Sequence, residues 1–312
     1  MRFPCLPPIA LAVAALLATH AKAQAPMLTR RDRLEMLYSD QLPFTPAGEP
    51  LITVRVIGGL TRIQVRSDAP MVVEPVGDPA SQVRVAAGAR WTITLDGAHA
   101  GKARSWVAAE RFSASDVARV AAARDRWAGM GFTPHVFEAG AVLGLGGHLI
   151  DSRTVTIGVE PSPTRAAAAK QGEALRARLS MLGEVVDEPL MRPGGVVVAR
   201  EARSGVEVLA SDLLAMRIAD DVPNPDATLA LVDVKWPRHG RGTRHYRGEL
   251  LFLVGPDRKL LVVNSVPAET LLEGVVPSEI FPNAPAEALK AQAVAARGQL
   301  LAKVGVRHRG EP

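Results

Sequence analysis

The sequence predicts an α+β fold, in which a β-rich domain with C-terminal helices is interrupted by an inserted α/β repeat module. Three observations favour it. Apolar and polar residues alternate, as in strands, both early and late in the chain. Between these regions, two similar stretches each contain a strand, a helix-start signal, an amphipathic helix and a glycine stop. A long alanine-rich helix follows the last strands.

The composition is that of a folded protein with aliphatic cores. Of its 312 residues, 47% are hydrophobic but only 4% are aromatic, so Val, Leu and Ala should fill the interior. The formal net charge is +5, and two of the positive charges, Arg2 and Lys22, lie near the N-terminus. A surplus this small does not favour a nucleic-acid partner.

Residues 1–23 have the pattern of a secretory signal peptide: Arg2, a short apolar run over residues 9–17, and an A-x-A cleavage site ending at Ala23. The run is too short to span a bilayer. We therefore expect an exported protein of the periplasm or cell envelope, without a transmembrane span after cleavage. The only cysteine, Cys5, would leave with this segment. The alternative is a buried N-terminal helix.

The next two regions are an N-terminal helix and linker (24–50) and a β-rich part (51–102). A short charged helix is predicted over residues 29–38, followed by a proline-rich linker. Strands are predicted at residues 52–57, 62–67, 81–86 and 91–96, where apolar and polar residues alternate between glycine and proline punctuation.

Residues 103–198 form a double β-α-β pattern, with further strands predicted at TPHVFEAG and at GVVVARE. The layout resembles the SPOR repeat domain, whose family binds bacterial glycan strands. This resemblance implies a ferredoxin-like module that binds glycan. An unrelated split β-α-β domain is the alternative.

Glycines gather at residues 140–148, including Gly144, Gly146 and Gly147. A phosphate-cradling loop would need a helix directly after it, but the strand-like RTVTIGV follows. We therefore predict a hairpin turn.

The final region, residues 199–312, is β-rich before its helices. One strand is predicted over residues 229–236, and a hairpin over 247–254 and 259–264. We expect these strands and the early ones to form one domain, with the repeat module inserted between them.

The segment WPRHGRGTRHYRG, residues 236–248, combines two histidines with four arginines. It could bind a phosphate-bearing polymer or nucleic acid, or His239 and His245 could hold a metal. No cysteine or acidic ligand accompanies them, so we assign no metal site. An exposed glycine-rich loop between strands is the favoured interpretation.

Two helices are predicted near the C-terminus. The first begins at Pro267 and ends at Gly274, because Pro277 disfavours helix at the residue before it and should place residues 275–279 in a turn. The second begins at Pro285, and small alanines on one of its faces allow close packing.

Glu279 is a lone carboxylate in this predicted turn, with Val275, Val276, Ile280 and Phe281 as neighbours. Poorly hydrated surroundings favour a neutral carboxyl, the form that can act as a general acid on a glycosidic bond. The alternative is a structural carboxylate that caps a helix or pairs with a nearby cation, Lys290 or Arg297.

The segment 246–308 resembles the opening part of the catalytic domain of the sporulation stage II protein D / LytB (SpoIID/LytB) family. The matching stretches are YRGEL, LLVVNSVP, LLEGVVPSEI and PAEALKAQAVAARGQLLAK. Some members are lytic transglycosylases that cleave peptidoglycan glycan strands stripped of stem peptides, and LytB-type members are described as amidase enhancers. The resemblance implies that Glu279, in the V-P-S-E pattern, is the catalytic acid.

The same resemblance implies cleavage between N-acetylmuramic acid and N-acetylglucosamine, with a 1,6-anhydro product and no cofactor. Lys290, Gln292 and Arg297 are the candidate substrate-binding residues. The family domain is longer than this segment and, in some members, holds a Cys/His zinc site in its later part, so we expect an incomplete domain here. A non-catalytic peptidoglycan-binding factor that positions a cell-wall amidase is the alternative function.

Overall fold

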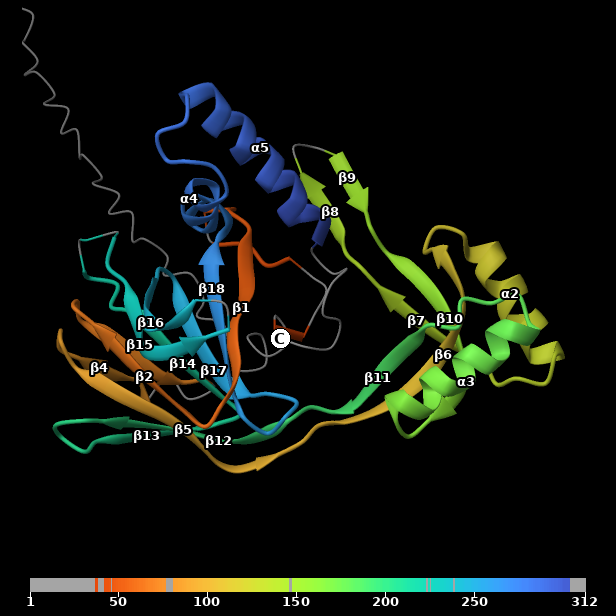
Figure 1. Cartoon of the computed structure of the whole chain (residues 1–312), viewed down its shortest axis with the longest axis horizontal. Helices are drawn as coiled ribbons and strands as arrows, with labels where there is room; N and C mark the ends of the chain where they lie inside the picture. Colours follow the sequence, from red (N-terminus) through yellow and green to blue (C-terminus); the bar gives the residue numbers. More distant parts are fainter. Residues whose placement is uncertain are drawn as a thin grey trace, which may run out of the picture.

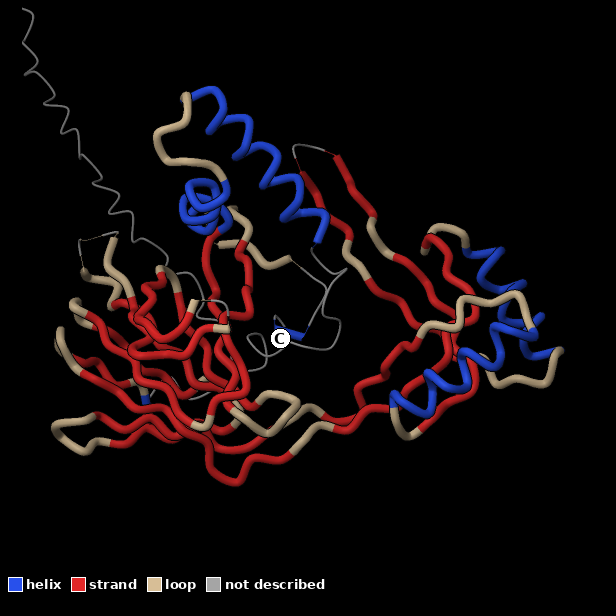
Figure 2. The backbone as a smooth tube through the Cα atoms, viewed as in Figure 1, coloured by secondary structure: helices blue, strands red, loops and turns tan. Residues whose placement is uncertain are grey.

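The computed structural model describes residues 37–38, 42–45, 47–76, 81–145, 148–222, 224, 226–237 and 239–303. The predicted signal peptide and most of the predicted helix over residues 29–38 lie outside this part. Leu37 and Tyr38 are helical. The α+β class is confirmed, with mainly antiparallel sheets and helices in two places (Figures 1 and 2).

Two six-stranded antiparallel sheets pack face to face (Figure 1). The first has the order β1 (Leu51–Leu60), β18 (Leu260–Pro267), β17 (Glu249–Val254), β14 (Leu213–Ile218), β3 (Met71–Pro75) and β4 (Val83–Val85). The second has the order β13 (Glu207–Ser211), β12 (Gly194–Glu201), β5 (Arg90–His99), β2 (Arg62–Ser67), β15 (Leu229–Trp236) and β16 (Gly240–Tyr246). Both sheets therefore combine strands from early and late parts of the chain.

Alternating side chains build the core between these sheets. In β2, Ile63 and Val65 are buried against the other sheet, whereas Arg62 and Gln64 are exposed. β3 departs from alternation, because all five of its residues are buried, and the sequence pattern did not predict this strand.

A separate four-stranded sheet lies between β5 and β12 in the chain. Its elements are β6 (Lys102–Ser113), α2 (Val117–Gly129), β7 (His135–Ala139), β10 (Thr154–Ser162), α3 (Arg165–Arg178) and β11 (Val185–Met191), and its strand order is β11-β6-β10-β7, all antiparallel. Ala123 and Trp127 of α2 pack with Val107 and Ile157 of the sheet, and Leu175 of α3 is partly buried against the same cluster. We call this unit the module.

One strand prediction in this region is wrong. GVVVARE was expected to belong to the repeat pattern, but it lies in β12 and pairs with β5 and β13 of the sandwich. The module strand is instead β11, whose sequence VVDEPLM carries two acidic residues and a proline and lacks apolar alternation. β11 is an edge strand, which tolerates proline because one side needs no hydrogen-bonding partner.

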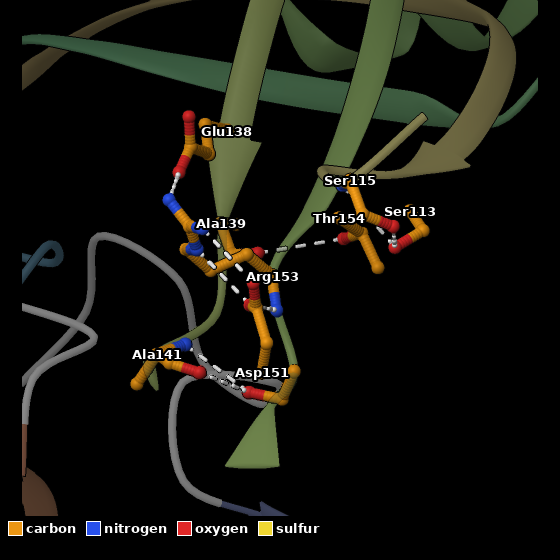
Figure 3. Close-up of polar contacts among 9 residues, drawn as sticks. Ser113, Ser115, Glu138, Ala139, Ala141, Asp151, Arg153 and Thr154 are labelled. Carbon is orange, nitrogen blue, oxygen red and sulfur yellow. Dashed lines mark hydrogen bonds and ion pairs between the residues drawn. The ribbon is translucent and has the colours of Figure 1, made fainter. Parts of the chain in front are cut away.

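The predicted hairpin at residues 140–148 is confirmed, as β8 (Val142–Leu145) paired with β9 (His148–Asp151). Gly140 begins it with a φ of +107°, and a Cβ there would lie 2.5 Å from the Ser152 carbonyl oxygen, so glycine is required. At its base, the guanidinium of Arg153 bonds to Asp151 and Glu138 (Figure 3). Hydrogen bonds from Arg153 hold the pKa of Asp151 below its usual range.

The C-terminal helices are α4 (Ala268–Glu279) and α5 (Ala286–Lys303). The predicted helix end at Gly274 and the turn after it are wrong, because α4 continues through Pro277 to Glu279. Pro277 lies in the last turn, where it removes only one backbone hydrogen bond. Ser278 Oγ donates to the Val275 carbonyl at 2.7 Å and satisfies an acceptor near the end of the helix.

None of the helices in the described part of the chain is both long enough and apolar enough to cross a bilayer.

Alanine substitution of two helical glycines should change stability in opposite directions. Gly172 in α3 is buried, and a Cβ there would lie 2.3 Å from the Gly183 carbonyl oxygen, whereas a Cβ at Gly274 in α4 would meet nothing within 4 Å. We expect Gly172→Ala to lower the free energy of unfolding by about 2 kcal/mol through overpacking. Gly274→Ala should raise it by about 0.5–1 kcal/mol through helix propensity.

Differential scanning calorimetry measures both effects as shifts in melting temperature. The two variants serve as controls for each other, since each adds one methyl group to the middle of a helix. Equal shifts in the same direction would contradict the close approach of α3 to Gly183.

Candidate functional site

Glu279 is the last residue of α4, and its carboxylate Oε2 accepts a hydrogen bond from Gln292 Nε2 of α5. Glu279 is exposed. Phe281 is exposed as well, with 80% of its surface accessible. Val276 points instead into the contact between the two helices. The prediction that Glu279 has apolar, poorly hydrated surroundings is therefore wrong, because the residue is exposed and Val276 packs into the helix contact.

The two helices meet through a small apolar contact. Leu272 and Val276 of α4 pack against Ala296 of α5, with Leu289 and Ala293 partly buried beside them. Small alanines on α5 allow the close approach that their spacing predicted. This contact brings the end of α4, with Glu279, next to Gln292.

Arg297 of α5 lies beside the opposite end of α4 from Glu279. Its guanidinium makes two hydrogen bonds to Glu269, in the first turn of the helix. These bonds lower the pKa of Glu269 and raise the pKa of Arg297. Ten residues separate Glu269 from Glu279, or about 15 Å along a helix. Arg297 therefore fixes the helix pair and does not contact Glu279.

Lys290 is exposed and pairs with Glu287 of the same helix, with 2.8 Å between Nζ and Oε1. Of the three predicted substrate-binding residues, only Gln292 contacts Glu279. The structural alternative, in which Glu279 pairs with Lys290 or Arg297, is also wrong, since both cations have other partners.

A cavity of about 280 Å³ lies on another face of α4 and was not predicted. Thr270 and Glu273 of the helix line it, with His245 and Arg247 across from them. Thr270 and Glu279 are nine residues apart, which places them about half a turn from each other around the helix. This cavity is therefore separate from the surface that carries Glu279.

Arg247 closes one side of that cavity. Its guanidinium bonds to Glu273 of α4 and, at 2.8 Å, to Asp226. Buried Asn264 donates to the carbonyl oxygens of Arg247 and Glu249 at 2.9 and 3.0 Å. These contacts fasten the strands beneath α4 and leave the Arg247 charge already neutralised.

Residues 256–311 match the family model of SpoIID, the stage II sporulation protein. This part of the chain belongs to the SpoIID family. The match relates the protein to sporulation and the cell wall, and it contains α4, α5 and Glu279. Neither a curated protein nor a solved structure matches the chain.

The matched SpoIID segment begins within the hairpin of β17 and β18, so the YRGEL stretch at residues 246–250 lies before it. The pair of strands nevertheless leads directly into α4. Leu51 of β1 pairs with Pro267 at the end of β18, and the Ala268 amide donates to the Pro50 carbonyl at 2.8 Å. The start of the SpoIID helix pair is thus fixed to the sandwich.

The arginine- and histidine-rich segment before the SpoIID match is a strand, β16, and not the exposed loop that we predicted. It forms the edge of the second sheet. Arg241 pairs with Asp233 at 2.9 Å, and Arg244 lies over the ring of Trp236 at 4.3 Å. Among the described residues, no group of three or more His, Cys, Asp or Glu side chains could hold a metal ion.

The helix-free face of the module carries three aromatic rings that sequence analysis missed. His135 of β7 stacks on Trp106 of β6 with 4.9 Å between ring centroids, and Phe137 meets Trp106 edge-on at 5.9 Å. Gly158 lies on the strand between them, and a Cβ there would lie 2.6 Å from the Phe137 ring. The glycine thus permits the contact, and nothing in the periodicity signals a contact across three strands.

The Glu269–Arg297 pair predicts a pH dependence. The pKa of Glu269 is lower in the folded protein than in the unfolded chain. The pair therefore adds to the free energy of unfolding at pH values above the ordinary pKa of a carboxyl group, and this contribution is lost as the pH falls through the lowered pKa. We expect Arg297→Gln to destabilise the protein at pH 7 but much less at acidic pH, in denaturant unfolding.

Lys303→Gln is the control, since it removes a positive charge from the same helix. A difference between Arg297→Gln and wild type that stays constant from pH 7 down to acid would contradict the assignment.

Proposed function

We propose that the protein is an exported cell-wall enzyme that cleaves peptidoglycan glycan strands stripped of stem peptides, with Glu279 as the general acid and base. The observation that carries the proposal is the position of this carboxylate in the SpoIID segment, at the accessible end of α4 and hydrogen-bonded to Gln292. The signal-peptide pattern of residues 1–23 supports export.

The reaction needs one carboxyl group. Neutral Glu279 donates its proton to the oxygen between N-acetylmuramic acid and N-acetylglucosamine, and the bond from that oxygen to C1 breaks. The resulting carboxylate then accepts the proton of the muramic acid C6 hydroxyl as its oxygen bonds to C1. The product is a 1,6-anhydro sugar, and neither water nor a second carboxylate takes part, unlike in hydrolysis by two carboxylates.

Gln292 suits a positioning role in this reaction. Its amide donates to Oε2 of Glu279, so the acidic proton of the neutral form belongs on Oε1. Because Glu279 is exposed, the glycan itself must displace water from the carboxyl group before proton transfer becomes efficient. Lys290 and Arg297 remain proposed sugar contacts, and Gln292 is the best placed of the three.

The alternative is a non-catalytic factor that binds peptidoglycan and positions a cell-wall amidase. The exposure of Glu279 favours it, since the carboxyl group lacks the dry surroundings that raise the efficiency of a general acid. In this case the same helix pair binds the glycan and the amidase supplies the chemistry.

We further propose that the module is a ferredoxin-like, SPOR-like unit that binds glycan. The β-α-β-β-α-β order and the β11-β6-β10-β7 sheet support the fold assignment. Trp106, His135 and Phe137 on the helix-free face support the binding role, because aromatic faces provide apolar contact with a polar rim. Neither proposed role requires a cofactor.

Substitution of the catalytic carboxylate tests the enzyme. We expect Glu279→Gln to lower the release of anhydromuramyl ends from stem-peptide-free strands by roughly 100-fold or more, as loss of a general acid does. Mass spectrometry measures the product. Glu287→Gln is the matched control, since Glu287 is an exposed carboxylate on the same helix pair.

Equal rates for Glu279→Gln and wild type would reject catalysis by Glu279. A wild type that yields no anhydro product but stimulates an amidase would establish the alternative function.

Glycan binding by the module is tested in the full chain by sedimentation with denuded and intact sacculi. We expect His135→Ala to weaken binding to denuded sacculi roughly three- to tenfold, because one aromatic contact contributes about 0.5–1.5 kcal/mol. Val136→Ala is the control, since Val136 is the next residue of β7, is 42% exposed and points to the opposite face. Equal binding by both variants, or no preference for denuded sacculi, would reject this role.

A further inference from the structure

The outer face of the second sandwich sheet carries three outward-pointing arginines, which we call the arginine face: Arg62, Arg66 and Arg90. Their neighbours Ile63 and Trp91 point into the core. Since successive residues of a strand point to opposite faces, the three guanidinium groups share the solvent side of the sheet.

The strand register places these charges close together. Arg66 of β2 lies directly opposite Arg90 of β5, and the Cβ atoms of such a pair are about 5 Å apart. Arg62 lies four residues along β2 on the same face, or about 13 Å away. Like charges directly opposite each other destabilise a sheet, so the arrangement gains from a bound anion.

The protein itself supplies little countercharge here. Among the described residues, Arg62 and Arg90 form no ion pair. Arg66 reaches Asp68 only at 3.5 Å, and its buried Nε has no hydrogen-bonding partner. Arg200, on the neighbouring strand β12, shows the contrast, because Glu207 accepts from its Nε at 2.7 Å.

A histidine extends this row across the sheet. Ala230 of β15 pairs with Arg66 on one side and with His245 of the edge strand β16 on the other. Arg90, Arg66 and His245 therefore lie in one line across four strands, a span of about 14 Å. This line uses one histidine of the 236–248 segment, whereas Arg241, Arg244 and Arg247 of that segment have partners of their own.

Polar side chains separate the arginines of the arginine face. Gln64 and Thr92 lie between the arginines on the same face, paired across β2 and β5. The side chains directly between the arginines are amide and hydroxyl groups, which do not insert into a lipid surface. Apolar side chains lie farther across the same face, at Val198 of β12 and at Leu209 of β13, which is 60% exposed. An extended anionic polymer can contact charges spaced along a flat sheet, and guanidinium groups bind phosphate oxygens in pairs.

We propose that the arginine face binds a linear polymer that carries phosphate groups. Charge complementarity is the basis: of the three clustered guanidinium groups, only that of Arg66 has a carboxylate partner among the described residues, Asp68. This binding surface involves neither Glu279 nor the α4–α5 pair. It adds a phosphate-bearing partner to the glycan of the proposed function and does not depend on it.

The test uses the full chain and long-chain inorganic polyphosphate as the probe, with Kd measured by isothermal titration calorimetry over a series of NaCl concentrations. We expect the double variant R62Q/R90Q to raise Kd at low salt by about tenfold or more. The slope of log K against log salt should fall by about 1.5, since each lost phosphate contact removes about 0.7–0.9 from it. The double variant R124Q/R178Q removes two exposed arginines from the module helices and should change Kd less than twofold.

Three results would overturn the proposal: no binding of polyphosphate by wild type, equal losses in both double variants, or tighter arginine-dependent binding to phosphatidylglycerol vesicles than to polyphosphate. Release of anhydromuramyl ends should be the same in R62Q/R90Q as in wild type. The two proposals can therefore fail separately.

Discussion

The pairing of β1 with β18 is the constraint on which the rest of the structure depends. It joins a strand from the start of the described chain to the strand that leads into α4. The pairing runs from Leu51 with Pro267 to Leu60 with Leu260 and contains two register shifts. Hydrogen bonding continues past the strands, since the Ala268 amide donates to the Pro50 carbonyl and the Glu269 amide donates to the side-chain Oε1 of Glu49 at 3.0 Å. The helix start is thus held from both ends of the sequence. The position of Glu279, twelve residues after Pro267, follows from that anchor and from the α4–α5 contact.

Local periodicity was sufficient to predict a strand where one of its faces is exposed to solvent and the other is buried. β2 and β5 alternate and were predicted, whereas β3, which is buried throughout, and β11, which carries Asp187, Glu188 and Pro189, were not assigned as the strands they are. The end of α4 was misplaced because a rule for proline inside a helix was applied to the last turn, where one lost hydrogen bond matters little. Fold class therefore follows from the sequence more readily than the boundaries that decide what surrounds a carboxylate.

The same limit applies to the site. The sequence identified Glu279 and named Gln292 as a candidate, and the structure brings these two together. The sequence could not predict how the two helices are oriented. Their orientation depends on which cation pairs with Glu269 and on how closely the alanines of α5 approach Leu272. The aromatic cluster of the module was equally hidden, because Trp106 and Phe137 meet across a strand on which Gly158 happens to lie. Contacts of this kind depend on register, which alternation alone does not specify.

An exposed Glu279 places a demand on the rest of the molecule. In the proposed reaction, a general acid on an open surface gains efficiency only when substrate covers it, so that reaction needs binding contacts elsewhere on the molecule. Two short segments, residues 100–101 and 192–193, connect the module to the sandwich by joining β5 to β6 and β11 to β12. They pass so closely that a Cβ at Gly101 would lie 2.7 Å from the Met191 carbonyl. Two such connections restrict the module more than one flexible linker would, which raises the effective concentration of a second contact on the same polymer. If both proposed surfaces contact the same glycan strand, together they hold it more tightly than either surface alone.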